Sequence, residues 1–185
     1  MSVAKAENGW VNTVDAQKPE VLEKAQHIIE SNLYCTLSTC SSEGFPWASP
    51  VFFAHDQAWN LYWSSATVSQ HSQNLYRNQG RTAIAIYSTS VDEGKGQGLY
   101  LSGTASELAP ERTPEIIKLL LQKLMLRGGT PPVRTAADYL PPSYRRIYHF
   151  QTQAVWITGE RAAFGNVLVD TKIQLNLSDL VRSQL

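Results

Sequence analysis

Five strand-length segments follow one another between residues 33 and 108, and they limit what this chain can fold into. In the first of them, Leu33, Cys35 and Leu37 occupy every second position, which is the spacing of a strand with one buried face. Turn residues separate neighbouring segments. The segments are residues 33–40, 47–54, 58–63, 81–88 and 99–108. With a further strand expected near residues 147–157, they predict a mainly β fold with flanking helices, a small barrel of about six antiparallel strands.

Two residues predict irregular places in these strands. Pro50 has no backbone donor, so residues 47–54 are expected to form an edge strand or to carry a bulge. Gly103, in the middle of residues 99–108, indicates a bulge or the close approach of another group. The segment 58–63 is expected to place Trp59, Leu61 and Trp63 on one side of a strand.

Two longer helices are predicted outside the strands. Pro19 suits the first turn of a helix that ends at Asn32. Thr113 and Pro114 are typical of the start of a second helix, and Gly128 is typical of its end.

The length of 185 residues suits one domain with a substantial core. Residues 1–185 are therefore expected to form a single domain. Within it, residues 1–17 are expected to be a loose N-terminal arm and residues 161–185 a C-terminal extension.

The charge balance excludes several classes of partner. Lys plus Arg and Asp plus Glu each number 16, so no basic field favours nucleic acid or an anionic membrane. No apolar run reaches transmembrane length and the start lacks the apolar core of a secretory signal, which together predict a cytoplasmic protein. Cys35 and Cys40 are expected to be reduced thiols. The four histidines lie far apart in sequence, so no metal site is predicted.

A hydroxyl-rich bend over residues 64–75 is the strongest candidate for a functional site. It runs from one predicted strand into a short helix, whose free N–H groups and dipole favour an anion. The residues proposed to hold a phosphate here are Ser65, Ser69, His71 and Ser72. His71 would donate a ring N–H or carry positive charge. Thr67 and Gln70 fit equally well the capping box of a helix that binds nothing, and the sequence leaves both interpretations open.

Residues 44–51 are a second candidate site. A strand interrupted by Pro50 leaves backbone groups free, and these could hydrogen-bond to the edge of a flat heterocycle. An edge strand with a bulge explains the same residues without a ligand. Trp47, Trp59, Trp63 and Trp156 could wall a planar cofactor, but packing is the commoner role of tryptophans at strand spacing.

In order and spacing, these pieces resemble the pyridoxamine 5'-phosphate oxidase-like family, the FMN-binding split β-barrels. The resemblance covers roughly residues 20–160 and depends on five pieces in a fixed order. They are Cys35-Thr36-Leu37-Ser38-Thr39, Gly44-Phe45-Pro46 with Ser49-Pro50-Val51, Tyr62-Trp63-Ser64-Ser65 with Ser69-Gln70-His71-Ser72-x-Asn74-Leu75, Ala83-Ile84-Ala85-Ile86-Tyr87, and Leu99-Tyr100-Leu101-Ser102-Gly103-Thr104-Ala105.

The resemblance implies a homodimer with two FMN sites at the subunit interface. Ser49, Pro50 and Val51 correspond to positions that meet the flavin and ribityl chain, and Ser64 and Ser65 lie beside the phosphate. Ser69, Gln70 and His71 match the phosphate-binding motif. Trp156 corresponds to an aromatic residue that reaches the flavin of the partner.

The chain departs from the oxidase itself at several charged positions. Ser69-Gln70-His71 stands where the oxidase has Ser-Arg-Lys, and Ser49 stands where it has an arginine. His71, the helix start and Arg77 or Arg81 would then have to supply the positive charge. The oxidase's Arg-x-His substrate pair is missing near Gly159. The resemblance therefore implies an FMN-dependent oxidoreductase of unknown substrate, with no catalytic residue assigned, rather than a pyridoxamine 5'-phosphate oxidase. The alternative is a non-catalytic flavin, haem or deazaflavin binding module.

Overall fold

The computed structural model describes residues 1–126, 128–130 and 132–183. The chain forms two compact units. Unit 1 comprises Met1–Asn32, Ala85–Leu101 and the chain from Gln153 onwards, and unit 2 comprises Leu33–Ile84 and Ser102–Thr152. Three strands contribute residues to both units, namely β6 (Arg81–Tyr87), β7 (Gly98–Glu107) and β8 (Arg145–Thr158). The expectation of a single domain over residues 1–185 stays a prediction.

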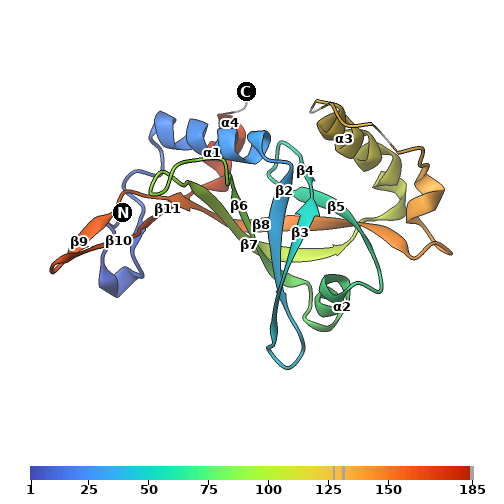
Figure 1. Ribbon diagram of the computed structural model, residues 1–185, viewed down its shortest axis with the longest axis horizontal. Coiled ribbons are helices and arrows are strands. Elements are labelled where there is room, and N and C mark those ends of the chain that lie inside the picture. Colours follow the sequence, from blue (N-terminus) through green and yellow to red (C-terminus); the bar gives the residue numbers. More distant parts are fainter. Residues whose placement is uncertain (127, 131, 184–185) are drawn as a thin grey trace. The chain divides into compact units, whose positions relative to one another are not determined.

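Unit 2 contains most of the strands that the sequence predicts. Those that belong to it alone are β2 (Tyr34–Cys40), β3 (Pro46–Phe52), β4 (Ala54–His55) and β5 (Leu61–Ala66). Its hydrogen-bonded strands follow the order β3–β2–β6–β7–β8–β5–β4. Its helical segments are α2 (Gln70–Arg77), α3 (Thr113–Met125) and the 3-10 turns η2 (Pro110–Arg112) and η3 (Ala136–Tyr139). Helix α2 lies beside the β2–β3 hairpin (Figure 1).

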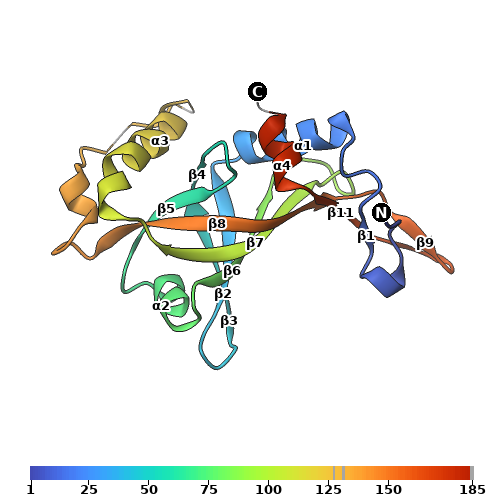
Figure 2. The same cartoon turned by 180° about the vertical axis from the view of Figure 1, so that it is seen from behind.

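Unit 1 combines short strands with two helices. Its own elements are η1 (Ala6–Asn8), β1 (Val11–Asn12), α1 (Pro19–Ser31), β9 (Ala162–Phe164), β10 (Val167–Val169), β11 (Lys172–Leu175) and α4 (Leu177–Arg182). Strand β1 pairs in parallel with β11 and β9 pairs with β10, while α1 lies beside α4 (Figure 2). The expected loose arm over residues 1–17 and extension over residues 161–185 stay predictions, and the arm contains a short strand, β1, that the sequence did not indicate.

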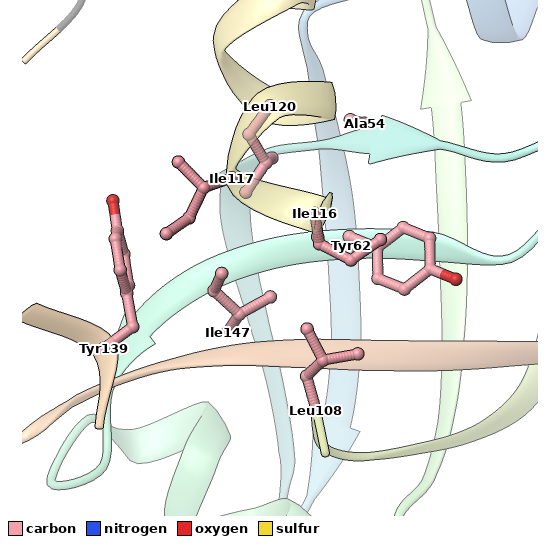
Figure 3. Packing of buried hydrophobic residues seen from close by; sticks show 8 residues of the cluster. All are labelled: Ala54, Tyr62, Leu108, Ile116, Ile117, Leu120, Tyr139 and Ile147. Carbon is pink, nitrogen blue, oxygen red and sulfur yellow. The ribbon is translucent and has the colours of Figure 1, made fainter. Parts of the chain in front are cut away.

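One apolar cluster of unit 2 packs α3 against the strands beside it. Its buried residues are Ala54, Tyr62, Leu108, Ile116, Ile117, Leu120, Tyr139 and Ile147 (Figure 3). Ile116, Ile117 and Leu120 lie at helical spacing, so they share the buried side of this helix. The cluster anchors α3 beside β4 and β5.

The predicted strand 58–63 begins later than expected, at Leu61. Trp59 has a positive φ of 63° and lies in the turn before β5. Asp56 holds that turn, because its Oδ1 accepts the backbone N–H groups of Ala58 and Asn60 at 2.9 Å and 3.0 Å. The placement of Trp59 on the strand was therefore wrong, although its side chain is fully buried.

The two irregular positions have the consequences that the sequence indicated. Strand β3, which contains Pro50, stands at the end of the strand order of unit 2. A Cβ atom at Gly103 would overlap the carbonyl oxygen of Gln151, so only glycine permits this close approach. Cys35 and Cys40 are free thiols. Among the described residues, no helix is long and apolar enough to span a membrane.

Candidate anion-binding site

Five polar residues of unit 2 form a cluster at the start of α2, and we call it the serine–histidine cluster. Its members are Ser49, Ser65, Ser69, His71 and Ser72. Ser49 comes from β3, Ser65 from β5, and the other three from the start of α2. The antiparallel hairpin and the bend thus bring together residues that lie 22 positions apart in sequence.

His71 is the centre of the cluster. Its Nδ1 lies 3.1 Å from Ser49 Oγ, and its Nε2 lies 2.8 Å from Ser65 Oγ and 3.0 Å from Ser69 Oγ. Burial lowers the pKa of His71 from its ordinary value of 6.5, because the charged form loses hydration. The lowered pKa favours the neutral imidazole at pH 7.

Counting hydrogens assigns the tautomer of His71. Ser69 Oγ donates its single hydrogen to the Ala66 carbonyl oxygen at 2.8 Å or to Ser72 Oγ at 2.9 Å. Ser69 then accepts from His71, which favours the tautomer with the ring hydrogen on Nε2. At the other side, Trp47 Nε1 donates to Ser49 Oγ at 2.9 Å, which leaves the Ser49 hydrogen for Nδ1. The ring therefore presents an N–H group to Ser65 and Ser69.

Helix α2 begins at Gln70 with Ser69 as its N-cap residue, and no side chain caps it. The first N–H groups of a helix have no partner within the helix, so they stay available to an anion. The capping-box interpretation was wrong, because Thr67 lies before the N-cap position. Gln70 Nε2 instead donates to Asn74 Oδ1 at 2.8 Å.

The other predicted site residues have contacts of their own. Pro50 is exposed and pairs with Thr36, while Val51 is buried opposite Cys35. Ser64 accepts a hydrogen bond from Arg145 Nη1 at 3.1 Å. Trp156 belongs to unit 1, where it pairs with Gln174 of β11.

Sequence reasoning missed two contributors. Trp47 donates to Ser49, and Arg145 brings a cation next to the predicted bend through Ser64. Arg145 is 81 positions away from Ser64, so only the pairing of β5 with β8 could reveal the contact. Arg77 and Arg81, which were expected to compensate for missing charge, donate instead to Gln73 and Asn78.

A family model described as pyridoxamine 5'-phosphate oxidase matches residues 21–156. The chain belongs to this family. The predicted fold class is confirmed, because the pyridoxamine 5'-phosphate oxidase-like split barrel combines a mainly β architecture with helices. No curated protein matches the chain.

Solved structures from several bacteria share the fold of this family member. A haem-binding protein from Mycobacterium smegmatis superposes with a TM-score of 0.61 and 20% identity, over 87% of this chain and 60% of that protein. A putative pyridoxamine 5'-phosphate oxidase from Listeria innocua superposes with a TM-score of 0.53 and 17% identity, over 73% of this chain and 95% of that protein. An F420 reductase superposes with a TM-score of 0.52 and 20% identity, over 70% of this chain and 94% of that protein. The family member thus spans 60% of the length of the mycobacterial protein.

Proposed function

We propose that this protein binds FMN and acts as an FMN-dependent oxidoreductase of unknown substrate. The observation that carries the proposal is the serine–histidine cluster, which gathers donors from two strands and a helix start at one point. Ser69 and His71 of the cluster, with Gln70 between them in sequence, match the positions of the family's phosphate motif, and Ser49 and Ser65 match neighbouring positions of the site.

The donors of the cluster fit a phosphate group. His71 Nε2–H and the hydroxyls of Ser65 and Ser69 converge on one side of the ring. The first N–H groups of α2 and the helix dipole add donors and partial positive charge. A phosphate dianion accepts only, so it matches a site whose groups can all donate once the hydroxyls turn toward it.

The other proposed contacts follow the family pattern. Ser64, Pro50 and Val51 would meet the ribityl chain and the flavin, and Ser72 would support the phosphate side. When bound, FMN would supply the electron-transfer chemistry, and the protein would supply orientation and shielding. We further propose a homodimer with FMN at the interface, in which Trp156 approaches the flavin of the partner subunit.

The missing Arg-x-His substrate pair after Gly159 argues against pyridoxamine 5'-phosphate as the substrate. Ser49 and Gln70 replace charged residues of the oxidase at the FMN site. Each charged hydrogen bond contributes about 1.5–3 kcal/mol, so a neutral cluster would bind phosphate less tightly than the oxidase does.

The test is a titration of the purified protein with FMN, followed by the quenching of flavin fluorescence. We expect saturable binding at up to tens of micromolar FMN, and weaker binding of riboflavin, which lacks the phosphate. His71→Ala should weaken FMN binding by about tenfold, which corresponds to roughly 1.4 kcal/mol. His27→Ala, an exposed histidine of unit 1, is the matched control and should leave binding unchanged. A flat titration would refute the proposal.

A non-catalytic module for flavin, deazaflavin or haem is the second candidate, because structural neighbours include a haem-binding protein and an F420 reductase. Both ring nitrogens of His71 contact serine hydroxyls, which disfavours His71 as an axial ligand of haem iron. Rapid reduction of bound FMN by NADH or NADPH in stopped flow would support the enzyme. A Soret shift with haemin, without flavin binding, would support the haem module.

A further inference from the structure

Trp47 begins a continuous series of hydrogen bonds that ends at Ser65. It lies two positions before Ser49 on β3, so both side chains are on the same face of the strand. The indole Nε1 of Trp47 donates to Ser49 Oγ at 2.9 Å, and Ser49 Oγ lies 3.1 Å from His71 Nδ1. His71 Nε2 lies 2.8 Å from Ser65 Oγ. Three contacts therefore connect the indole to Ser65 through Ser49 and the imidazole ring.

The two serines on either side of His71 favour opposite tautomers of its ring. A neutral imidazole has one donor and one acceptor, so only one of the two serines can donate to it. Ser49 and Ser65 are 9% and 8% exposed, and a buried hydroxyl hydrogen without an acceptor is destabilising. Ser69 adds a preference for the hydrogen on Nε2, but its hydroxyl can also turn from the Ala66 carbonyl and donate to Nε2. The balance therefore depends on a group whose hydrogen-bond role cannot reverse.

The Trp47 indole is such a group, because an indole N–H donates and never accepts. Since Ser49 Oγ accepts from Trp47, its own hydrogen is directed to His71 Nδ1, its other hydrogen-bond neighbour among the described residues. The ring hydrogen then lies on Nε2, and Ser65 accepts from the ring. If Nδ1 carried the hydrogen instead, the Ser49 oxygen would face two donors and its own hydrogen would have no acceptor. Trp47 therefore sets the order of donors and acceptors through His71.

This order leaves the hydrogen of the Ser65 hydroxyl for a ligand. In the part of the chain that the structure describes, the one hydrogen-bond neighbour of Ser65 Oγ is His71 Nε2, which donates to it. A phosphate only accepts, so it suits a buried hydroxyl whose hydrogen has no acceptor in the protein. In the reverse order, Ser65 would donate to Nε2, and its hydrogen would be withdrawn from an anion.

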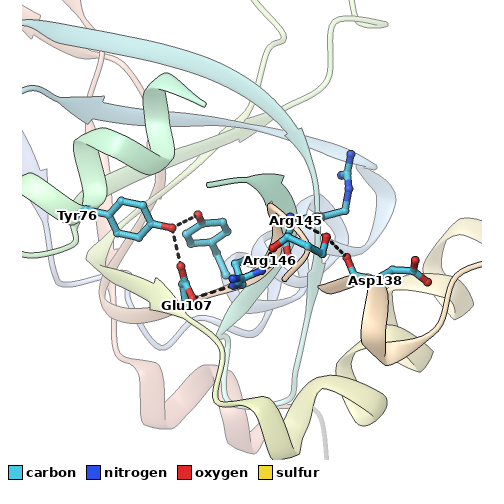
Figure 4. Close-up of polar contacts among 7 residues, drawn as sticks. Tyr76, Glu107, Asp138, Arg145 and Arg146 are labelled. Carbon is cyan, nitrogen blue, oxygen red and sulfur yellow. Dashed lines mark hydrogen bonds and ion pairs between the residues drawn. The ribbon is translucent and has the colours of Figure 1, made fainter. Parts of the chain in front are cut away.

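The arginine paired across the strands from Ser65 has a partner of its own. Arg146 stands opposite Ser65 in the β5–β8 pair and donates to Glu107 Oε2 at 3.2 Å. Glu107 Oε1 also accepts from Tyr76 Oη at 2.6 Å, so this carboxylate offsets the charge of Arg146 (Figure 4). The attraction of the cluster for a phosphate therefore depends on where the hydrogens of its neutral groups point.

We infer that Trp47 is a positioning residue of the anion site, because its donation to Ser49 orders the hydrogen bonds through His71 and leaves Ser65 to donate to an anion. The order is a property of the protein without ligand. Its consequence for FMN affinity rests on the proposed function, because a donor that is already oriented needs no reordering to meet the phosphate.

Trp47→Phe is the first test, because it removes the indole donor and keeps an aromatic ring at a position that is 45% exposed. In the FMN-free protein at pH 8, where the His71 ring is neutral, the nitrogen NMR signals of the imidazole report its tautomer. The variant should shift the tautomer ratio toward hydrogen on Nδ1. FMN binding should weaken by about threefold to tenfold, the range for one neutral hydrogen bond, while riboflavin binding stays unchanged.

Trp10→Phe is the matched control, because Trp10 is a half-buried tryptophan of unit 1 that contacts Phe164. It should leave the His71 signals and both flavin affinities unchanged. Trp47→Leu, which also lacks the indole donor, repeats the test if Trp47→Phe fails to fold.

A double-mutant cycle tests the route through Ser49. If Trp47 acts through this hydroxyl, Trp47→Phe should have no further effect on the His71 signals or on FMN affinity in a Ser49→Ala background. Equal effects in the two backgrounds would overturn the inference, since a general loosening of the hairpin does not need the Ser49 hydroxyl.

The outcomes separate this inference from the proposed function. Unchanged His71 signals in the folded Trp47 variants would overturn the positioning role whether or not FMN binds. A changed tautomer ratio with unchanged FMN affinity would overturn the link to the anion site. A wild-type protein that does not bind FMN, but whose tautomer ratio changes in Trp47→Phe, would refute the proposed function and keep the positioning of His71.

Discussion

His71 combines a neutral ring with a site that suits an anion. Burial keeps the ring uncharged, and three serine hydroxyls surround it with groups that can donate or accept. The sequence predicted Ser65, Ser69 and His71 together because they lie within seven positions of one another. It could not determine the tautomer, which depends on Trp47 and on the Ala66 carbonyl.

The lowered pKa of His71 has a consequence for stability. Burial also lowers the pKa of His149, assisted by the charge of Arg112. Because the unfolded chain takes up these protons first, the free energy of unfolding should be highest above pH 6.5. It should then fall as the pH drops from 6.5 through the folded pKa values.

Urea unfolding at pH 7.5, 6.5 and 5.5 measures this dependence. His71→Gln should show a smaller loss of unfolding free energy between pH 6.5 and 5.5 than the wild type, because one of the two histidines no longer titrates. An identical loss in both proteins would mean that burial does not lower the pKa of His71.

At the scale of elements, local signals predicted α1 closely and β5 less well. Pro19 starts α1 and Asn32 follows its last residue, as helix-end chemistry indicates. Strand β5 begins three positions after Ala58 because Asp56 holds the preceding turn, and Trp59 takes a positive φ there. Tertiary burial of the Trp59 side chain compensates for this conformation, and no local pattern shows it.

The close approach at Gly103 in β7 predicts how a substitution there changes the stability of the fold. Gly103→Ala should lower the free energy of unfolding by about 1–3 kcal/mol, because the new methyl group would overlap the carbonyl of Gln151. Gly96→Ala is the control, since nothing lies within 4 Å of a Cβ at that position. Equal urea midpoints for Gly103→Ala and the wild type would contradict the close approach.

The packing of helix α3 gives a second stability prediction for an element. Ile116 is 1% exposed within the cluster that joins this helix to β4 and β5. Ile116→Ala should cost about 2–5 kcal/mol of unfolding free energy through lost burial and a cavity. Lys118→Ala, exposed on the same helix, should change it by less than about 0.5 kcal/mol. A similar small change for both variants in urea unfolding would show that α3 contributes little to the core.

At the scale of the whole molecule, exposed aromatic side chains on one hairpin bear on the oligomeric state of the protein. Tyr34, Phe45 and Trp47, all on the β2–β3 hairpin, expose 60%, 70% and 45% of their surface. Phe45 and Trp47 lie at the turn end of the hairpin and Tyr34 lies at its other end. Exposed aromatic side chains are enriched at interaction surfaces. They agree with the homodimer that we propose.

Sedimentation velocity should therefore give twice the 20.6 kDa mass of one chain. If FMN lies at the interface, an FMN titration should saturate at one flavin per chain, which is two per dimer. A monomer at micromolar concentration that still binds FMN would refute the interface site and leave the serine–histidine cluster intact.

The sequence by itself determined the mainly β class and the two long helices, and it narrowed Pro50 to an edge strand or a bulge and Gly103 to a bulge or a close approach. These features depend on local periodicity and on the backbone chemistry of proline and glycine. Both can be recognised in a short stretch of sequence. Only the tertiary structure decided that Ser49 meets His71, that Arg145 meets Ser64 and that Tyr76 meets Glu107. These contacts join residues far apart in the chain, so strand pairing and burial determine them, and no local pattern contains that information.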